Sequence, residues 1–347
     1  MKTNAFYINR CLELARNGLG TTYPNPLVGC VIVCDNTIIG EGWHIKAGDA
    51  HAEVRAIQAV KDQSLLKKST LYVTLEPCSH YGKTPPCSDL IIAKKIPNIV
   101  IGTLDPFAEV AGKGIQKLLA AGRNVVVGVC EEECEALNRR FFTFHRKKRP
   151  YIILKWAETK QGFIAPADQK AGGIFWITNP YSQQLVHKWR SEEQGILIGT
   201  QTAVKDNPKL NTRHWAGKNP TRIVLDKSLK LPKHLSILDT SQPTVVFHHN
   251  TSTAENQKNL SFEPLDFESD LLPQILDKLY QLELQSVIIE GGSKTLQKFI
   301  DSDLWDEARV FTGQNEIENG TKGPRLNRQA SSTTEIEGDQ LNYFYND

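Results

Sequence analysis

Four side chains near the start of the chain have the chemistry of a catalytic metal site. His51 and Glu53 form a His-x-Glu pair, and Cys78 and Cys87 follow in the sequence. One histidine and two cysteines leave the fourth tetrahedral position of a zinc ion open for water, which distinguishes a catalytic zinc from a structural one. Zinc lowers the pKa of bound water to roughly 7, so hydroxide is available at neutral pH and Glu53 can shuttle its proton.

The order of these residues is informative, although each pair alone is not. Most His-x-Glu pairs are solvated helix residues, but His-x-Glu followed by Pro-Cys and a second cysteine is the signature of zinc deaminases acting on a ring carbon. Here the second cysteine comes nine positions after the first, and not three. Because the insert ends in Pro85-Pro86-Cys87, we expect it to fold out as a loop and to return Cys87 to the site.

The elements that must position these residues are predicted from apolar periodicity. A strand over 71–75 ends directly before Glu76-Pro77-Cys78, and helices are expected from about His51 and over 87–95. Within a regular helix His51 and Glu53 would point about 200° apart, so the pair can converge only at a helix end. Further strands are expected at 28–34, 37–43, 98–102 and 124–129, and further helices at 4–17 and 112–121. This alternation predicts an α/β sandwich whose sheet is at least partly parallel.

Length and composition set the broad class. A chain of 347 residues is long enough for two domains. The net charge of +2 gives no general attraction to nucleic acid or to an anionic membrane. Seven cysteines without a recognisable secretory signal or apolar span favour reduced thiols and metal binding over disulfides. We therefore expect a cytoplasmic protein that does not bind a membrane or nucleic acid.

A basic stretch at 139–150 has two interpretations. Its arginines and lysines could form a nucleic-acid-binding arm, but the interleaved Phe141, Phe142 and Phe144 suggest docking, and Pro150 suggests a linker. We favour a domain boundary near 145–150, which divides the chain into residues 1–147 and 148–347.

The second half repeats the alternation of strands and helices. Strands are expected at 151–157, 195–199, 222–226, 244–248 and 286–290, and helices at 181–190, with Asn179 as N-cap, and at 271–282. The last strand ends in Glu290-Gly291-Gly292 before a helix, where glycines let backbone amides approach a phosphate. From the residues alone, this half is an α/β domain with a phosphate-binding turn.

Several motifs of the first half resemble the bifunctional deaminase/reductase family of riboflavin biosynthesis. The resemblance rests on the twelve residues from Glu76 to Cys87, on Pro24-Asn25-Pro26-Leu27-Val28-Gly29, and on Asp105-Pro106 with Gly112-Lys113-Gly114-Ile115. It implies a cytidine-deaminase-like α/β/α sandwich that binds one zinc ion. By this resemblance His51, Cys78 and Cys87 bind zinc, Glu53 is the proton shuttle, Asn25 contacts the pyrimidine, and His44 lines the pocket mouth with the 80–84 loop.

The second half resembles the reductase part of the same family. The motifs are Lys155-Trp156-Ala157, Trp176-Ile177-Thr178, Arg190, the stretch from Gly199 to Thr202 with Asp206-Asn207-Pro208, and Glu290-Gly291-Gly292. The resemblance implies a dihydrofolate-reductase-like α/β domain that uses NADPH. Ala157, Trp176, Thr202, Asp206 and Gly292 would contact NADPH, and Arg190, Leu210, Arg213 and Glu290 would face the substrate. Ile174 departs from the polar residue of many relatives, and residues 311–315 depart from an expected glycine-rich stretch.

The resemblance implies two successive reactions on one small phosphoribosyl pyrimidine in a homo-oligomer, either a dimer or a tetramer. The first half would deaminate 2,5-diamino-6-(5-phosphoribosylamino)pyrimidin-4(3H)-one. The second half would reduce the ribosyl group and give 5-amino-6-(5-phosphoribitylamino)uracil. Two other interpretations remain open from the residues: a deaminase of free or polynucleotide bases with a binding module, and a non-enzymatic interaction protein stabilised by zinc.

Overall fold

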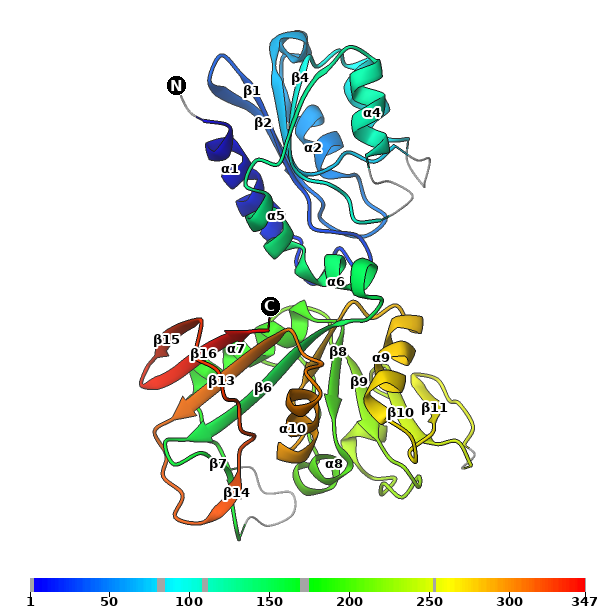
Figure 1. The fold of residues 1–347 in the computed structure, drawn as a ribbon, viewed down its shortest axis with the longest axis vertical. Coiled ribbons are helices and arrows are strands. Elements are labelled where there is room, and N and C mark those ends of the chain that lie inside the picture. Colours follow the sequence, from blue (N-terminus) through cyan, green and yellow to red (C-terminus); the bar gives the residue numbers. More distant parts are fainter. Residues whose placement is uncertain (1–2, 80–84, 108–111, 169–174, 252–253, 347) are drawn as a thin grey trace. The chain divides into compact units, whose positions relative to one another are not determined.

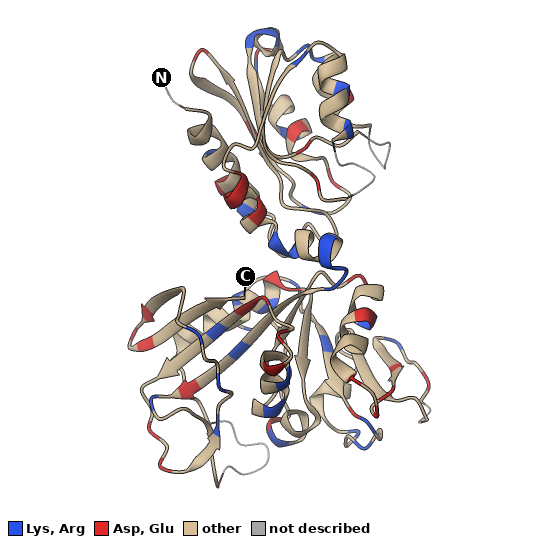
Figure 2. Ribbon diagram, in the orientation of Figure 1, with Lys and Arg blue, Asp and Glu red and all other residues tan. Residues whose placement is uncertain are grey.

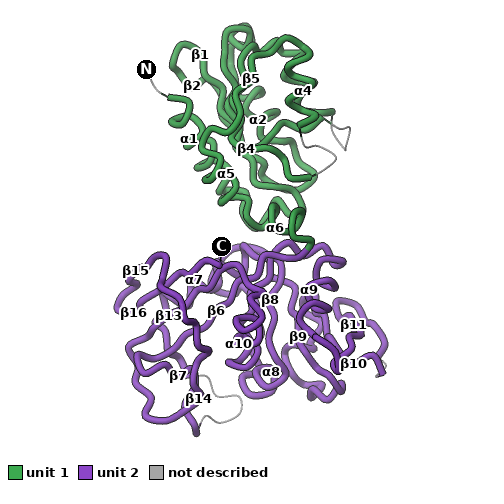
Figure 3. The backbone as a smooth tube through the Cα atoms, in the orientation of Figure 1, with its two compact units in different colours: residues 1–148 green, residues 149–347 purple. Residues whose placement is uncertain are grey.

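The structure is a computed structural model that describes residues 3–79, 85–107, 112–168, 175–251 and 254–346. The chain divides into two compact units, Met1–Lys148 and Arg149–Asp347 (Figure 3). Each unit has its own sheet and its own hydrophobic core. Among the helices in the described ranges, none combines the length and the apolar character needed to cross a membrane.

The sheet of the first unit has the strand order β2-β1-β3-β4-β5. Strand β1 is antiparallel to both of its neighbours, whereas β3, β4 and β5 are mutually parallel, as the alternation in the sequence predicts. The bounds are β1 (Gly29–Cys34), β2 (Thr37–Trp43), β3 (Thr70–Leu75), β4 (Asn98–Thr103) and β5 (Asn124–Val127).

Helices cover both faces of this sheet (Figure 1). Cys30 and Ile32 of β1 pack with one helix layer, and Val31 and Val33 pack with the other. The whole strand is therefore apolar and buried, as expected of a strand covered on both sides. The first layer contains α2 (Ala52–Ala59), α3 (Cys87–Ala93) and α4 (Lys113–Ala120), and the second contains α1 (Asn4–Arg16) and α5 (Glu131–Leu137). The predicted α/β/α sandwich is confirmed.

The basic stretch that the sequence suggested as a docking segment and linker is a helix, α6 (Arg139–Lys147). Phe141 and Phe142 are buried against Leu75 and Val28, so the docking interpretation of the phenylalanines is correct. The helix ends at Lys147, before Pro150, the residue that suggested a linker. In Figure 2 much of the α6 ribbon is blue and the ribbon of the acidic α5 next to it is largely red, and Arg146 forms an ion pair with Glu135 at 2.7 Å. The sequence did not predict this helix, because its many basic residues obscure the helical periodicity of its apolar residues.

The sheet of the second unit has the order β11-β10-β9-β8-β12-β6-β13-β16-β15. Neighbouring strands from β11 to β13 are parallel, and β16 and β15 continue the sheet as an antiparallel hairpin. The bounds are β6 (Tyr151–Thr159), β8 (Gly195–Ile198), β9 (Thr221–Leu225), β10 (Thr244–His249), β11 (Leu260–Leu265), β12 (Ser286–Ile289), β13 (Glu307–Gly313), β15 (Ser332–Ile336) and β16 (Asp339–Tyr345). The sequence predicted β6, β8, β9, β10 and β12. It did not predict β11, β13, β15 or β16, in which the pattern of apolar and polar residues is weaker.

This sheet too is covered on both faces. Ile152 and Leu154 of β6 pack with α9 and α10, whereas Tyr151 and Ile153 pack with α7. Asn179 caps α7 as predicted, because its side chain accepts hydrogen bonds from the amides of Tyr181 and Ser182. The helices are α7 (Pro180–Glu192), α8 (Thr200–Asp206), α9 (Leu271–Gln281) and α10 (Ser293–Asp301), and a separate ribbon pairs β7 (Phe163–Pro166) with β14 (Gly320–Lys322).

Strand order decides which residues of the second unit meet. Strand β12 lies between β8 and β6, and the three run parallel. Ligands of parallel α/β sheets bind beyond the carboxyl ends of such strands. Thr200 follows β8 and Glu290 follows β12, so these segments lie at one edge of the sheet although they are distant in the sequence.

Candidate active sites

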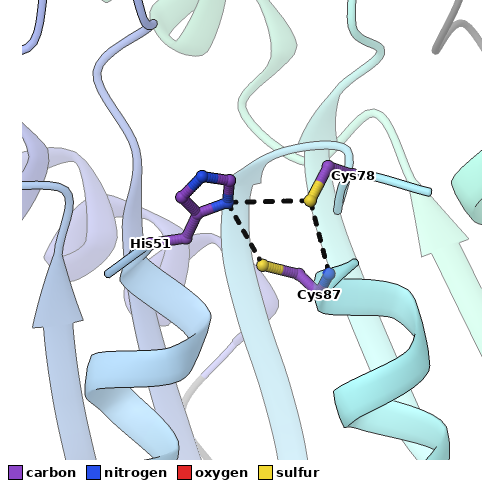
Figure 4. A group of neighbouring side chains, drawn as sticks. All are labelled: His51, Cys78 and Cys87. Atoms are coloured by element: carbon purple, nitrogen blue, oxygen red, sulfur yellow. Dashed lines mark hydrogen bonds between the residues drawn. The ribbon is translucent and has the colours of Figure 1, made fainter. Parts of the chain in front are cut away.

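The three predicted metal ligands converge in the first unit (Figure 4). The Nδ1 atom of His51 lies 3.6 Å from Sγ of Cys78 and 3.3 Å from Sγ of Cys87. All three ligand atoms lie within 4.8 Å of one another. The insert between the cysteines therefore returns Cys87 to the site, as expected; its residues 80–84 lie outside the described ranges.

The ligands converge because each lies at the end of a regular element. His51 is the N-cap of α2 and has an extended backbone, with φ −68° and ψ 164°, so it escapes the helical angle that would separate it from Glu53. Cys78 follows the end of β3, and Cys87 is the first residue of α3. The backbone amide of Cys87 donates to Sγ of Cys78 at 3.3 Å, which favours a thiolate there.

The donor set fits a tetrahedral zinc ion. With Zn–N near 2.0 Å and Zn–S near 2.3 Å, the nitrogen–sulfur edge of a tetrahedron is about 3.5 Å, close to the two distances observed. Donation from the Cys87 thiol is the main cause that lowers the pKa of Cys78 to about 4, and the same contact raises the pKa of Cys87. The cluster thus favours a thiolate at Cys78, and a thiolate is the form of cysteine that binds zinc.

Glu53 is the buried acid beside this cluster. Its exposed fraction is 3%, and it interacts with the Cys87 thiol. Burial, followed by the nearby Cys78, raises the pKa of Glu53 to about 7. A cation held by the cluster would oppose this shift, because positive charge favours the carboxylate. Because burial raises the pKa of Glu53 above the usual range of a carboxyl group, the side chain is suited to exchanging a proton near neutral pH.

Glu76 anchors the cysteine turn, a role that the sequence did not reveal. Its buried carboxylate accepts hydrogen bonds from the amides of Gly112 and Gly114, both at 2.9 Å, at the start of α4. A Cβ atom on Gly114 would lie 2.1 Å from the carbonyl oxygen of Pro77. Glycine is thus required for α4 to approach the Glu76-Pro77-Cys78 turn. The hydrogen bonds from the two amides to the Glu76 carboxylate then hold the start of α4 against this turn.

Asn25 and His44 lie together. The amide Nδ2 of Asn25 is 3.0 Å from Nε2 of His44, and the ring of His44 is 5.4 Å from that of His51. His44 was expected at the mouth of the site, but only 3% of it is exposed. Burial lowers its pKa, and the neutral imidazole can therefore hold the Asn25 amide.

A second residue missed in the sequence, Asn138, fixes the segment that carries Asn25. Its side chain accepts from the amide of Leu27 and donates to the carbonyl oxygen of Leu27, both at 2.8 Å. Asn138 is 2% exposed and lies between α5 and α6. Nothing in its sequence neighbourhood indicates this pair, because the two residues are 111 positions apart.

In the second unit, a group of charged side chains surrounds the residue that follows β12. Arg190 donates to the carboxylate of Glu290 at 2.8 and 3.3 Å, and to the carbonyl oxygen of Asn211 at 3.3 Å. Burial opposes ionisation of Glu290, but Arg190 and Lys155 together lower its pKa to about 2. Burial lowers the pKa of Lys155 and of Arg213. The sequence predicted roles for Arg190, Arg213 and Glu290 but none for Lys155.

Two of the predicted cofactor residues, Thr202 and Gly292, lie beside the glycine turns that follow β8 and β12, whereas Ala157 lies on β6. The amide of Gly292 donates to Oγ1 of Thr202 at 2.8 Å. A Cβ atom on Gly291 would lie 2.6 Å from the amide nitrogen of Gly199, so the turns contact through backbone. Trp176 is 47% exposed, and Asp206 ends α8. An exposed aromatic ring and close glycine turns at a sheet edge fit a dinucleotide. Ile174 lies outside the described residues.

Comparisons with known proteins agree with this two-part architecture. The family of cytidine and deoxycytidylate deaminase zinc-binding regions matches residues 1–103, and the RibD C-terminal domain matches 150–313. The two units thus define a two-domain enzyme that joins a zinc deaminase to a reductase.

Relatives of full length identify the family. The chain is 42% identical to the riboflavin biosynthesis protein RibD of Aquifex aeolicus, over 88% of this chain and 85% of the relative. It is 34% identical to RibD of Escherichia coli, over 88% and 86%. The crystal structure of a Thermotoga maritima deaminase/reductase matches with a TM-score of 0.88 and 35% identity, over 99% of this chain and 98% of that one.

The chain belongs to the RibD family of riboflavin biosynthesis proteins. It is a bifunctional enzyme with a deaminase domain that binds zinc and a reductase domain that uses NADPH. The dihydrofolate-reductase-like assignment of the second half agrees with its mostly parallel sheet.

Proposed function

We propose that residues 1–147 deaminate 2,5-diamino-6-(5-phosphoribosylamino)pyrimidin-4(3H)-one and that residues 148–347 then reduce its ribosyl group. The Thermotoga maritima relative is described as a diaminohydroxyphosphoribosylaminopyrimidine deaminase and 5-amino-6-(5-phosphoribosylamino)uracil reductase. The observation that carries the proposal is the convergence of His51, Cys78 and Cys87 within 4.8 Å beside the buried Glu53.

In the first reaction, His51, Cys78 and Cys87 would hold zinc. Bound zinc supplies a Lewis acid that makes water nucleophilic at neutral pH. Glu53 accepts a proton from this water and delivers it to the departing amine nitrogen, so that ammonia leaves and a carbonyl replaces the amine. Its burial prevents loss of that proton to solvent.

Asn25 and His44 orient the pyrimidine for this step. Because His44 holds the Asn25 side chain at 3.0 Å, the amide has a defined direction before substrate binds. An amide offers both a donor and an acceptor, which suits the edge of a pyrimidinone ring.

In the second reaction, Arg190, Leu210, Arg213 and Glu290 bind the phosphoribosyl pyrimidine. Opening of the ribosylamine ring breaks the bond between the anomeric carbon and the ring oxygen, which takes the amine proton, and leaves a C=N imine to the pyrimidine amine nitrogen. Bound NADPH would supply a hydride to this carbon. Lys155 donates the accompanying proton to the imine nitrogen, because its lowered pKa makes the ammonium a better acid. Glu290 offsets the buried positive charges and keeps Lys155 in place. Hydride and proton together convert the imine to the CH2–NH group of the ribityl product.

The residues for NADPH are Ala157, Trp176, Thr202, Asp206 and Gly292. Trp176 offers its exposed ring to an apolar face of the cofactor, and Thr202 and the Gly292 turn lie where a pyrophosphate would approach the start of α10.

Three further expectations complete the proposal. Reduced cysteines favour a cytoplasmic location, since all seven are free. The net charge of +2 argues against nucleic acid as a partner. A homo-oligomer, dimer or tetramer, stays a prediction that light scattering of the purified protein would check.

The deciding experiment is an anaerobic incubation of the chain with the diamino substrate, in which ammonia and NADPH are followed separately. We expect ammonia release without NADPH, and NADPH oxidation only after deamination. A zinc chelator should stop ammonia release but leave reduction of the already deaminated pyrimidine intact. NADPH oxidation without ammonia release would contradict the proposed order, and deamination of single-stranded nucleic acid would favour the alternative base deaminase.

A further inference from the structure

His187 is a buried histidine in the second unit that none of the assigned roles uses. It lies on α7 one turn before Arg190, and its exposed fraction is 3%. Its ring is 4.8 Å from the ring of His214, nearly perpendicular to it. His187 therefore lies on the helix that supplies Arg190 and contacts the 211–214 segment that supplies Arg213.

The two ring nitrogens of His187 have different surroundings. The backbone carbonyl of Asn211 accepts a hydrogen bond from the ring, as it does from Arg190. In contrast, Nδ1 is buried and has no hydrogen-bond partner among the residues that the structure describes. A buried polar atom without a partner is costly, and such atoms in a binding site commonly have a role there. A neutral imidazole with one donor leaves the other nitrogen ready to accept a proton.

The surroundings of His187 explain why it is neutral. Burial lowers its pKa most, and Arg190, Arg213 and His214 lower it further, to about 4. Glu290 is the carboxylate that faces the histidine, and it is already shared by Arg190 and Lys155. The three cations Lys155, Arg190 and Arg213 thus outnumber this carboxylate. Such an excess of positive charge is suited to a dianion, and arginine pairs grip phosphate with two parallel hydrogen bonds.

We propose that His187 is a further binding residue for the substrate phosphate, and that it takes up a proton from solvent when this phosphate binds at Arg190 and Arg213. This inference rests on the substrate site proposed above. The dianion cancels the repulsion that Arg190 and Arg213 exert on a protonated imidazole. The proton at Nδ1 then gives this atom a partner and adds a third positive group against the phosphate.

The direction of the pH dependence follows from this coupling. His187 is neutral in the free protein and protonated in the complex, so binding takes up a proton. Affinity then falls as the pH rises through the pKa that His187 has in the complex. The second pKa of a phosphate monoester is about 6. Above pH 7.5 the free ligand is therefore essentially a dianion, and proton uptake reports on the protein.

The test is calorimetric titration of the full zinc-loaded chain with ribose 5-phosphate. Heats measured at one pH in two buffers with different ionisation enthalpies give the number of protons taken up. We expect uptake by the wild-type chain at pH 7.5 to 8. We expect His187→Gln to take up none, and to bind about tenfold more weakly at pH 7, which corresponds to one pKa unit. The difference should shrink towards pH 9.

His214→Gln is the matched control, because His214 is the exposed neighbour whose ring meets that of His187 edge to face. This variant should retain proton uptake. Unchanged NADPH binding and circular dichroism would show that the His187 variant is folded. A wild-type chain that binds ribose 5-phosphate without proton uptake would overturn this proposal alone, whatever the variants do. Uptake that disappears in His214→Gln but persists in His187→Gln would also overturn it. If the wild-type chain did not bind the sugar phosphate, the placement of the substrate would fail as well.

Discussion

The side chains that line the two proposed sites carry charge of opposite sign. In the first unit, two thiols, an imidazole and a carboxylate lie together and form a donor set for a cation. In the second, Lys155, Arg190 and Arg213 surround one carboxylate, an excess of positive charge that suits an anion. The sign of the charge in each cluster therefore favours a metal ion in the first unit and the phosphate proposed above in the second.

The sites also differ in what holds their side chains. The metal ligands are held by backbone: a helix N-cap, a strand end and the first residue of a helix. The charged side chains of the second unit are held mainly by one another, as Arg190 and Glu290 show. A substitution in the first site should therefore reduce activity without reducing the stability of the fold, whereas a substitution in the second site should reduce both activity and stability. The four predictions below test this difference.

The largest effect is expected for Glu53→Gln. Glutamine keeps the size of the side chain but cannot shuttle a proton, so ammonia release should fall by about 10³-fold. Zinc content and the midpoint of thermal unfolding should stay close to wild type, since the ligands are unaltered. Reduction of the deaminated pyrimidine with NADPH serves as the internal control and should be unchanged. Ammonia release equal to wild type would refute the role given to Glu53.

Glu290→Gln should show the mixed effect expected of the second site. Removing the carboxylate leaves Arg190 and Lys155 without their buried counter-charge, and breaking such a pair typically costs about 3–5 kcal/mol. We expect reduction to fall by about 10²-fold and denaturant unfolding of the second unit to shift to lower concentration. Deamination should persist. The control is Glu335→Gln on the exposed strand β15, which should change neither quantity.

Asn138→Ala tests whether the first site also depends on long-range support. The variant leaves the backbone N–H and C=O of Leu27 without the bonds at 2.8 Å, so Asn25 loses its fixed position. We expect KM of the diamino substrate to rise about tenfold, with zinc content unchanged and some loss of stability, about 1–3 kcal/mol. Asn124→Ala, which removes an exposed side-chain hydrogen bond to Asn98, is the control. Loss of zinc in the Asn138 variant would show that the damage is not confined to substrate positioning.

The smallest effect is expected for Trp176→Ala. The ring is 47% exposed, so its removal costs little packing. The KM for NADPH should rise by about three- to tenfold, because one apolar contact is worth about 1 kcal/mol. Ammonia release should be unaffected. Tyr181→Ala, another exposed aromatic, should leave the KM for NADPH alone. Parallel loss of both activities with the fold intact would mean that the two reactions are not divided between the units.

Much of the fold follows from local patterns. Strand β1 is buried on both faces and reads as an unbroken apolar run, and Asn179-Pro180 marks the start of α7 through capping chemistry alone. Helix α6 and strands β11, β13, β15 and β16 were not predicted. Their residues satisfy the pattern only through distant partners, as when Phe142 of α6 packs on Leu75.

The sequence by itself determined the kinds of metal ligand, the elements that carry them and the class of chemistry, because these ligands occupy element ends that neighbouring residues encode. His51, Cys78 and Cys87 could be assigned in this way. Only the tertiary structure decided which distant groups meet: Asn138 with Leu27, and Arg190 with Glu290, which are 100 positions apart. The physical reason is that such pairs depend on how distant elements pack: Asn138 reaches Leu27 from the junction of α5 and α6, and β12 enters between β8 and β6 only in the folded sheet.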